Sequence, residues 1–267
     1  MQNKENSAKE KAKILQNVIK EYLDQIVIHP TLETVEKDFH AIDRLGSVHI
    51  ILAVSSEEIH KEGSKFDEDY AKSLTYEQYM YIKNTLTNMI SSDCEQIKKN
   101  ELKELGKITW DLCSRKCLLN YLSRELDWVT VSILSASYIS SIVLLRSVFE
   151  LLIGIATRQT GSMTNRISSI WFLSKNDKKK LNKLWGELCE WAHPYGSWVK
   201  NTCSVFMAYK PMYHPVLCEN CVEKLEQITD LLLVVTIKKF KINKEDLKMK
   251  LAKYKVDLSK YPIFMNG

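Results

Sequence analysis

The feature that most constrains the fold is the scarcity of turn-forming residues: the 267-residue chain has eight glycines and five prolines. An all-β protein needs many tight turns, which glycine and proline favour, whereas a bundle of long helices needs few. The hydrophobic content of 45% and the charged content of 27% are ordinary for a soluble globular protein. The composition therefore predicts an all-α protein.

Apolar residues recur at the helical period along almost the whole chain. We expect helices over 9–27, 32–61, 67–98, 108–125, 128–158, 177–192, 216–240 and 245–254. Thr75 is a candidate N-cap that would divide the third of these. We predict a single helical-bundle domain with a long central helix at 128–158. Its parts are an N-terminal helical region packed on the core (1–105), the core (106–241) and a basic C-terminal extension (242–267).

The segment Trp128–Leu145 contains eighteen consecutive uncharged residues, close to the ~20 that span a bilayer. Six serine and threonine side chains make the segment only moderately apolar, and its apolar character continues past Arg146 and Glu150 to Ala156. We favour the central helix of a soluble bundle. A membrane helix over 128–156 is the alternative.

The net charge of +5 is unevenly placed, because residues 238–260 carry nine lysines against three acidic residues. That segment has a charge of +6 and the rest of the chain −1. Lysine clusters attract phosphate backbones by releasing counterions, although a solvated helix face gives the same pattern. The candidate nucleic-acid contacts are Lys238, Lys239, Lys241, Lys248 and Lys250.

Arg146 and Glu150 are spaced i, i+4 within a long apolar run, so they share one helix face. They form either an intrahelical ion pair or the lining of a polar cleft. His193 is followed by Pro194, which predicts a helix C-terminus at this histidine. The helix dipole would favour the protonated imidazole there, for acid catalysis, phosphate binding or capping. We treat Arg146, Glu150 and His193 as the candidate catalytic residues.

The chain has seven cysteines, an odd number that favours reduced thiols in the cytoplasm. The polar N-terminus, Met1–Lys13, lacks the apolar segment of a signal peptide. A zinc site is an alternative role for some of these cysteines, because tetrahedral zinc sites take cysteine and histidine ligands. Its members would be Cys189, His193, Cys203, His214, Cys218 and Cys221. Because the single CxxC falls within a predicted helix, we predict no metal and no cofactor.

Two segments carry a family resemblance: "LLRSVFELLIG" over 144–154 and "LWGELCEWAHP" over 184–194. Together they resemble the HEPN superfamily of prokaryotic helical proteins, over about residues 108–240. The resemblance implies a helical bundle, often a homodimer, in phage-defence or stress systems. Some members cleave RNA, and others bind nucleotides or act as scaffolds for protein partners.

Members of this family that cleave RNA without a metal place an arginine before the histidine, with four to six residues between the two. Here those positions hold Gly186, Glu187 and Leu188, so the arginine is absent. We therefore favour a binding or regulatory module whose partners are RNA, a nucleotide or a protein. One alternative is a metal-independent ribonuclease in which Arg146 replaces the absent arginine, with Glu150 and His193. The other is a membrane-associated helical protein.

Overall fold

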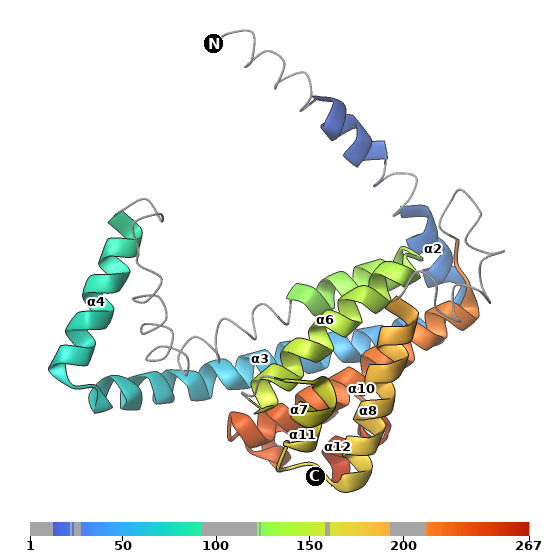
Figure 1. The fold of residues 1–267 in the computed structure, drawn as a ribbon. Helices are drawn as coiled ribbons and strands as arrows, with labels where there is room; N and C mark the ends of the chain where they lie inside the picture. Colours follow the sequence, from blue (N-terminus) through green and yellow to red (C-terminus); the bar gives the residue numbers. More distant parts are fainter. Residues whose placement is uncertain are drawn as a thin grey trace, which may run out of the picture.

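The computed structural model describes residues 13–21, 23, 28–91, 122, 124–157, 161–192 and 212–266. Helices joined by short turns and connectors make up this part of the chain, which contains no strand (Figure 1). The predicted all-α fold is therefore confirmed. The predicted helix at 108–125 lies almost entirely outside the described residues.

The helix at the centre of the body is α10, Pro215–Lys239. Pro215 occupies its first turn, and the His214 side chain caps it by accepting the backbone N–H of Leu217 at 3.4 Å. Seventeen of its 25 residues are buried, because α3, α6 and α12 pack against it from different sides. A helix enclosed in this way needs apolar residues around most of its circumference, which the run Leu231–Val235 supplies.

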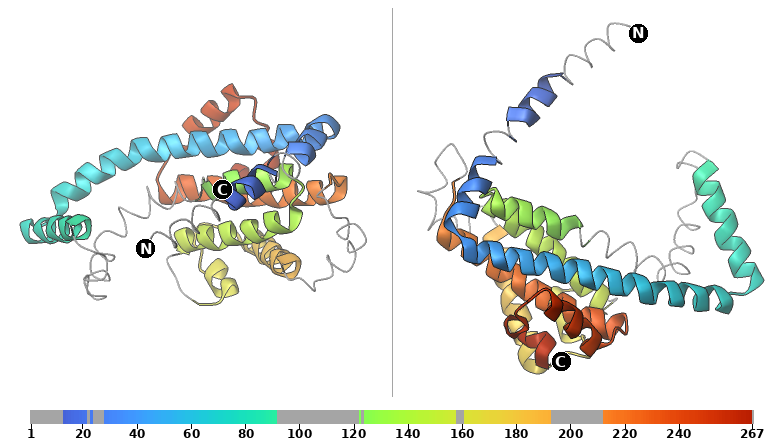
Figure 2. Two further views of the ribbon diagram at one scale, coloured as in Figure 1. Left: turned by 90° about the horizontal axis from the view of Figure 1, so that it is seen from above. Right: turned by 180° about the vertical axis from the view of Figure 1, so that it is seen from behind.

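The segment 128–158, predicted as one helix, is divided in two. A first helix over 124–134 ends at Ala136, whose φ is +56°, and α6 follows as Tyr138–Thr157. The backbone N–H of Ser137 donates to Ser132 O at 2.9 Å, and that of Ala136 donates to Ile133 O at 3.0 Å. This is the Schellman pattern that ends helices with a left-handed residue. The chain turns back there, and the two helices form a hairpin (Figures 1 and 2).

Helix α6 lies within the bundle, packed against α10, α8 (Lys175–Ala192) and α7 (Met163–Ser168). Among the described helices, α6 is the one that is long and apolar enough to cross a membrane. Of its most apolar 18-residue stretch, 44% is buried inside the protein. Its contacts are those of a core helix. The predicted membrane span over 128–156 is interrupted at Ala136.

The N-terminal half contains α2 (Ile28–Lys37), the 35-residue α3 (Phe39–Ser73) and α4 (Tyr76–Ser91). Helix α3 runs through Gly46 and Gly63 without ending. Its first part packs on α10, and its second part extends beyond the body toward α4 (Figures 1 and 2). Thr75 caps α4 as predicted: its hydroxyl accepts the N–H of Gln78, and the Gln78 side chain accepts the N–H of Thr75.

The C-terminal segment is part of the helical body. Helix α11 (Lys244–Lys253) packs on α3, and the short η3 (Leu258–Lys260) leads into α12 (Pro262–Asn266), which packs on α10. The side chains that face inward are fully or nearly fully buried: Leu247, Leu251, Val256, Tyr261, Ile263 and Phe264. The segment predicted as a basic extension therefore contributes to the core.

Candidate functional site

The predicted catalytic pair lies at the contact between α6 and α8. Arg146 Nε is 3.5 Å from Glu150 Oε1, and the two side chains are 35% and 44% exposed. They form the intrahelical ion pair expected from their spacing, but their charges are half in water rather than buried. The cost of burying charge in an apolar helix therefore does not arise for this pair.

The aromatic side chain of Trp185 on α8 completes this arrangement. The guanidinium of Arg146 lies over the Trp185 ring, with Cζ 5.1 Å from the ring centroid. The same ring stacks on Phe149 at a centroid distance of 6.0 Å and an interplanar angle of 18°. A cation over an aromatic face is stabilised by the ring quadrupole. Arg146 is therefore occupied by one acidic and one aromatic partner from its own chain.

Cys189, one turn beyond Trp185 on α8, lies in the same electrostatic environment. Burial raises the pKa of the Cys189 thiol, while the Arg146 charge opposes that shift and the Glu150 charge adds to it. The thiol is thus protonated at neutral pH and is a poor nucleophile. His193 follows four residues later and lies outside the described residues, so the structure brings together only two of the three predicted catalytic residues.

The three positions at which the resemblance to the HEPN superfamily leads us to expect a catalytic arginine, 186–188, face different surroundings. Gly186 is exposed, and a Cβ atom built there meets nothing within 4 Å. Leu188 is fully buried in the core. Glu187 forms an ion pair with Lys224 of α10. An acidic residue and a core leucine therefore occupy two of the positions that this chemistry reserves for a cation.

A polar cleft that the sequence did not predict lies between α8, α10 and the C-terminal segment. It encloses about 420 Å³. Its charged lining residues are balanced, four lysines against four acids: Lys180, Lys183, Lys224, Lys260, Glu187, Glu223, Glu226 and Asp230. The Lys224 side chain is only 8% exposed, pairs with Glu187, and has its Nζ 5.5 Å from the centre of the Trp191 ring.

Three acidic residues of α10, Glu219, Glu226 and Asp230, have buried partners outside this helix. Glu226 accepts from Arg44 Nε at 2.9 Å and from Arg44 Nη2 at 2.6 Å, while Arg44 Nη1 donates to Glu219 at 2.5 and 2.6 Å. Hydrogen bonds to the two carboxylates raise the pKa of Arg44 despite its burial. Asp230 accepts the backbone N–H groups of Ile263 and Phe264 at 2.9 and 2.8 Å. Burial outweighs those bonds and raises the pKa of Asp230 to about 6.

A sequence signal for this network does exist. The acidic residues Glu219, Glu223, Glu226 and Asp230 recur every three or four positions, which places them along one face of α10. Nothing in the local sequence, however, pairs them with Arg44 or with the backbone of α12. These contacts join residues more than thirty positions apart.

The predicted nucleic-acid lysines are placed unevenly. Lys238 and Lys239 lie in the last turn of α10 and are partly exposed, and Lys241 is exposed just beyond it. Lys248 pairs with Glu245 at 2.9 Å, and Lys250 pairs with Glu58 of α3. Two of these five lysines are therefore used in ion pairs within the protein.

The cysteines proposed for zinc do not come together in the described part of the chain. Cys218 and Cys221 are buried in α10, where burial raises the pKa of the Cys218 thiol to about 12. His214 accepts a backbone hydrogen bond as the N-cap of the same helix. His193 and Cys203 lie outside the described residues. Among the residues that are described, no group of three or more His, Cys, Asp or Glu side chains could hold a metal ion.

Comparisons of this chain with protein-family models, with curated proteins and with solved structures find no match.

Proposed function

We propose that this chain is a non-catalytic binding protein that pairs with a second copy of itself. The observation that carries the proposal is a band of large apolar side chains exposed on the hairpin of residues 124–157. Trp128 is 57% exposed, Val131 42%, Ile139 40% and Val143 48%. Exposed apolar side chains that gather on one element are typical of interaction surfaces.

The hairpin places these side chains at matching heights. Trp128 precedes and Val143 follows the turn at Ala136 by about two helical turns each. Val131 and Ile139 lie about one turn from it, on opposite sides. The four residues therefore lie at two matching levels of the hairpin, and we propose that they form one band across both helices.

The charges beside this band favour a second copy as the partner. Arg124 and Asp127 lie on the same helix as Trp128 and are both exposed. A twofold interface needs a surface complementary to itself, with both signs of charge within reach of each other. Packing the hairpin against its own copy would bury the apolar band and leave charges of both signs at its edge. The four helices would then form a bundle.

The state of the α6–α8 site supports binding rather than catalysis. Arg146 is held by Glu150 and Trp185, and Glu187 neutralises Lys224. A catalytic arginine must be free to stabilise the charge that develops on a phosphate. The defence or stress role implied by the resemblance, and a location in the cytoplasm, remain part of this proposal.

The first test replaces the apolar band. We expect Trp128→Gln with Val143→Gln to convert a dimer into a monomer, because the two most exposed apolar side chains of the band leave the interface. Light scattering coupled to size-exclusion chromatography measures the mass. The control is Trp171→Gln, which removes a tryptophan 74% exposed at the other end of the body. A dimer that survives the double substitution would rule out this surface.

A metal-independent ribonuclease is the second candidate, favoured by one observation. The charges of Arg146 and Glu150 both act on Cys189, which precedes His193 by four residues. If the chain is such a ribonuclease, the purified protein cleaves mixed RNA in the presence of EDTA, and His193→Ala abolishes cleavage. If the protein does not cleave RNA, or if His193→Ala leaves cleavage unchanged, the ribonuclease candidate is excluded.

A further inference from the structure

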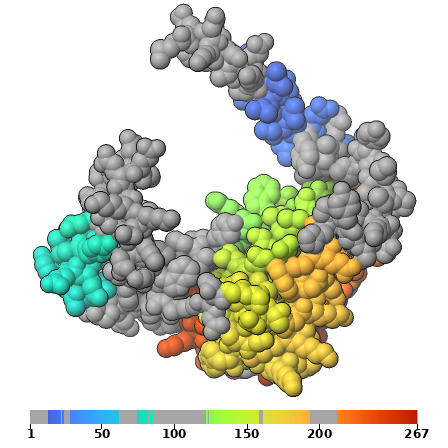
Figure 3. Space-filling model, in the orientation of Figure 1, coloured from blue at the N-terminus to red at the C-terminus, as the bar shows by residue number. Residues whose placement is uncertain are grey.

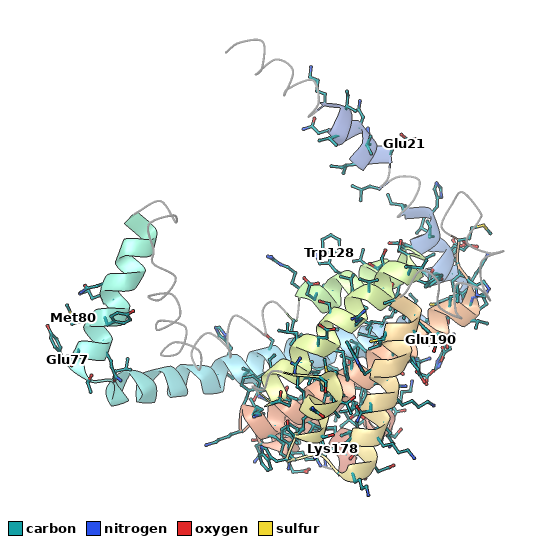
Figure 4. All side chains as sticks on the ribbon, in the orientation of Figure 1. Glu21, Glu77, Met80, Trp128, Lys178 and Glu190 are labelled. Atoms are coloured by element: carbon teal, nitrogen blue, oxygen red, sulfur yellow. The ribbon has the colours of Figure 1, made fainter. Side chains whose placement is uncertain are left out.

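A basic face lies on α7, the connector 169–174 and the first half of α8, away from the apolar band. Residues 175–183 contain five lysines and one acid, Asp177. The Asp177 carboxylate accepts from the Ser174 hydroxyl at 2.6 Å, in the N-cap of α8. The whole-chain charge count conceals this segment because acidic residues elsewhere balance it. Figure 4 shows Lys178 and Trp128 at opposite ends of the body.

Part of this basic face surrounds a hollow of about 630 Å³. The hollow is lined by lysine, asparagine and serine and by no acid: Ser168, Lys175, Asn176, Lys178, Lys179 and Asn182. Lys178 donates to the backbone carbonyl of Ser168 at 2.8 Å, which ties α8 to α7 across the hollow. Lys175 and Lys179 are exposed and make no ion pair within the described part of the chain. Their charges remain available to an anion.

An exposed aromatic ring lies in the connector that leads into α8, four residues before Lys175 in the chain. In the connector 169–174, Ile170 and Leu173 are buried and anchor the backbone, whereas Trp171 between them is 74% exposed. Its ring meets Phe172 edge to face at a centroid distance of 5.4 Å. The connector thus holds a large flat ring in solvent at little further entropic cost on binding. Figure 3 shows the surface of α7 and α8 turned toward the viewer.

We infer that this basic face, with Lys175, Lys179 and Trp171 at its centre, binds single-stranded nucleic acid. Lysines beside a hollow neutralise phosphates, and an exposed ring accepts a stacked base. Stacking requires unpaired bases, so a duplex fits this face less well than a single strand. Asn176, which is exposed, supplies an amide group that suits the polar edges of bases. The inference is independent of the proposed dimer, since the two surfaces lie apart.

A lipid surface is the main competitor for a tryptophan beside lysines. Membrane-binding faces combine several exposed apolar residues with basic ones. Here Trp171 is the large apolar side chain exposed between Met163 and Ala192. The lysines, moreover, line a shallow depression that is open to solvent. A single exposed apolar side chain among several lysines favours a nucleic-acid strand over a membrane as the partner.

The experiment measures fluorescence anisotropy of a labelled 20-nucleotide single-stranded DNA of mixed sequence with the full chain. DNA is the probe because it lacks the 2′-hydroxyl that a ribonuclease would use, so binding is read separately from cleavage. We expect Lys175→Glu with Lys179→Glu to weaken binding about tenfold or more. The slope of log Kd against log salt concentration should fall by about 1.4, at about 0.7 for each phosphate contact on a single strand.

The matched control reverses two exposed lysines of the C-terminal segment, Lys253→Glu with Lys260→Glu, and makes the same change in net charge. We expect this control to weaken binding less than threefold, as a rough limit for a non-specific charge effect. We expect Trp171→Ala to weaken binding about fivefold or more, and Trp171→Phe to restore most of it, because phenylalanine keeps a stacking face.

Three outcomes would overturn the inference: no binding at low salt, equal losses in the two lysine pairs, or a duplex bound as tightly as the single strand. Anionic phosphatidylserine vesicles form a fourth arm. Vesicle binding that depends on Trp171 and Lys175, without binding of the strand, would assign the face to a membrane. Circular dichroism melting of each variant identifies any loss that comes from unfolding.

Discussion

At the scale of single residues, the ion pairs of this protein differ in how far they are exposed to water. Arg146 and Glu150 are half exposed, whereas Arg44 and Glu226 have side-chain exposures of 6% and 11%. Breaking a buried pair leaves one charge without a partner in a medium of low dielectric constant, which costs far more than breaking an exposed one. The ion pairs of α10 therefore govern stability, and the predicted catalytic pair does not.

Substitution of the buried partner tests this difference. We expect Glu226→Gln to lower the free energy of unfolding by about 3 kcal/mol or more, because Arg44 loses its buried counter-charge. Glu219→Gln changes the same kind of residue where the side chain is 51% exposed, and should cost less than about 1 kcal/mol. Urea unfolding measures both. Equal losses of unfolding free energy in the two variants would contradict this account, because the buried ion pair would then contribute no more than the exposed one.

The carboxyl group of Asp230 predicts a dependence on pH. Its pKa is raised from the ordinary value of 3.8 to about 6 in the folded chain, so the folded state binds the proton more tightly. The stability that this group contributes is present below about pH 4 and is lost as the pH rises through 6. The loss is about 3 kcal/mol, at about 1.4 kcal/mol for each unit.

The measurement compares Asp230→Asn with the parent chain by urea unfolding at pH 4.5 and pH 7. The variant cannot ionise, so its stability relative to the parent should increase between these two pH values. Asp246→Asn, an exposed aspartate in the first turn of α11, serves as the control. A stability difference that stays constant with pH would show that Asp230 keeps its charge state on unfolding.

At the scale of elements, the local sequence predicts helices well and their ends less well. The periodicity around 177–192 and 216–240 matches α8 and α10, and the Thr75 cap is correct. The turn at Ala136 carries no glycine or proline, so no local signal divides the segment 128–158. Conversely, α3 runs through Gly46 and Gly63, because each glycine costs only about 1 kcal/mol in a long helix.

The left-handed conformation of Ala136 gives an element-scale prediction. A β-branched residue is strongly disfavoured at a φ of +56°, so Ala136→Val should cost about 2 kcal/mol and loosen the hairpin. Ala136→Gly should stay close to the parent, because relief of about 1 kcal/mol of strain offsets the lost burial of a methyl group, about 0.8 kcal/mol. Thermal unfolding followed by circular dichroism ranks the three chains. A valine variant as stable as the parent would contradict the Schellman turn.

At the scale of the whole molecule, the sequence predicts the fold class but not which helix lies at the centre. Both α6 and α10 are apolar, and only their tertiary contacts distinguish them. The same limit applies to the sites. Arg146 and Glu150 pair within one helix and were predictable, whereas the contacts of Arg44 and Asp230 join distant segments. The basic face of α8 was visible in the sequence, but the charge count pointed to residues 238–260 instead.

The central claim is that the hairpin 124–157 joins two copies of this chain. Sedimentation equilibrium of the unmodified protein over about 1–100 µM, in which specific homodimers commonly form, measures the mass directly. A single chain has a mass of 31.0 kDa. The account predicts that the mass approaches twice this value as concentration rises. A mass that stays at 31.0 kDa across the whole range would contradict it.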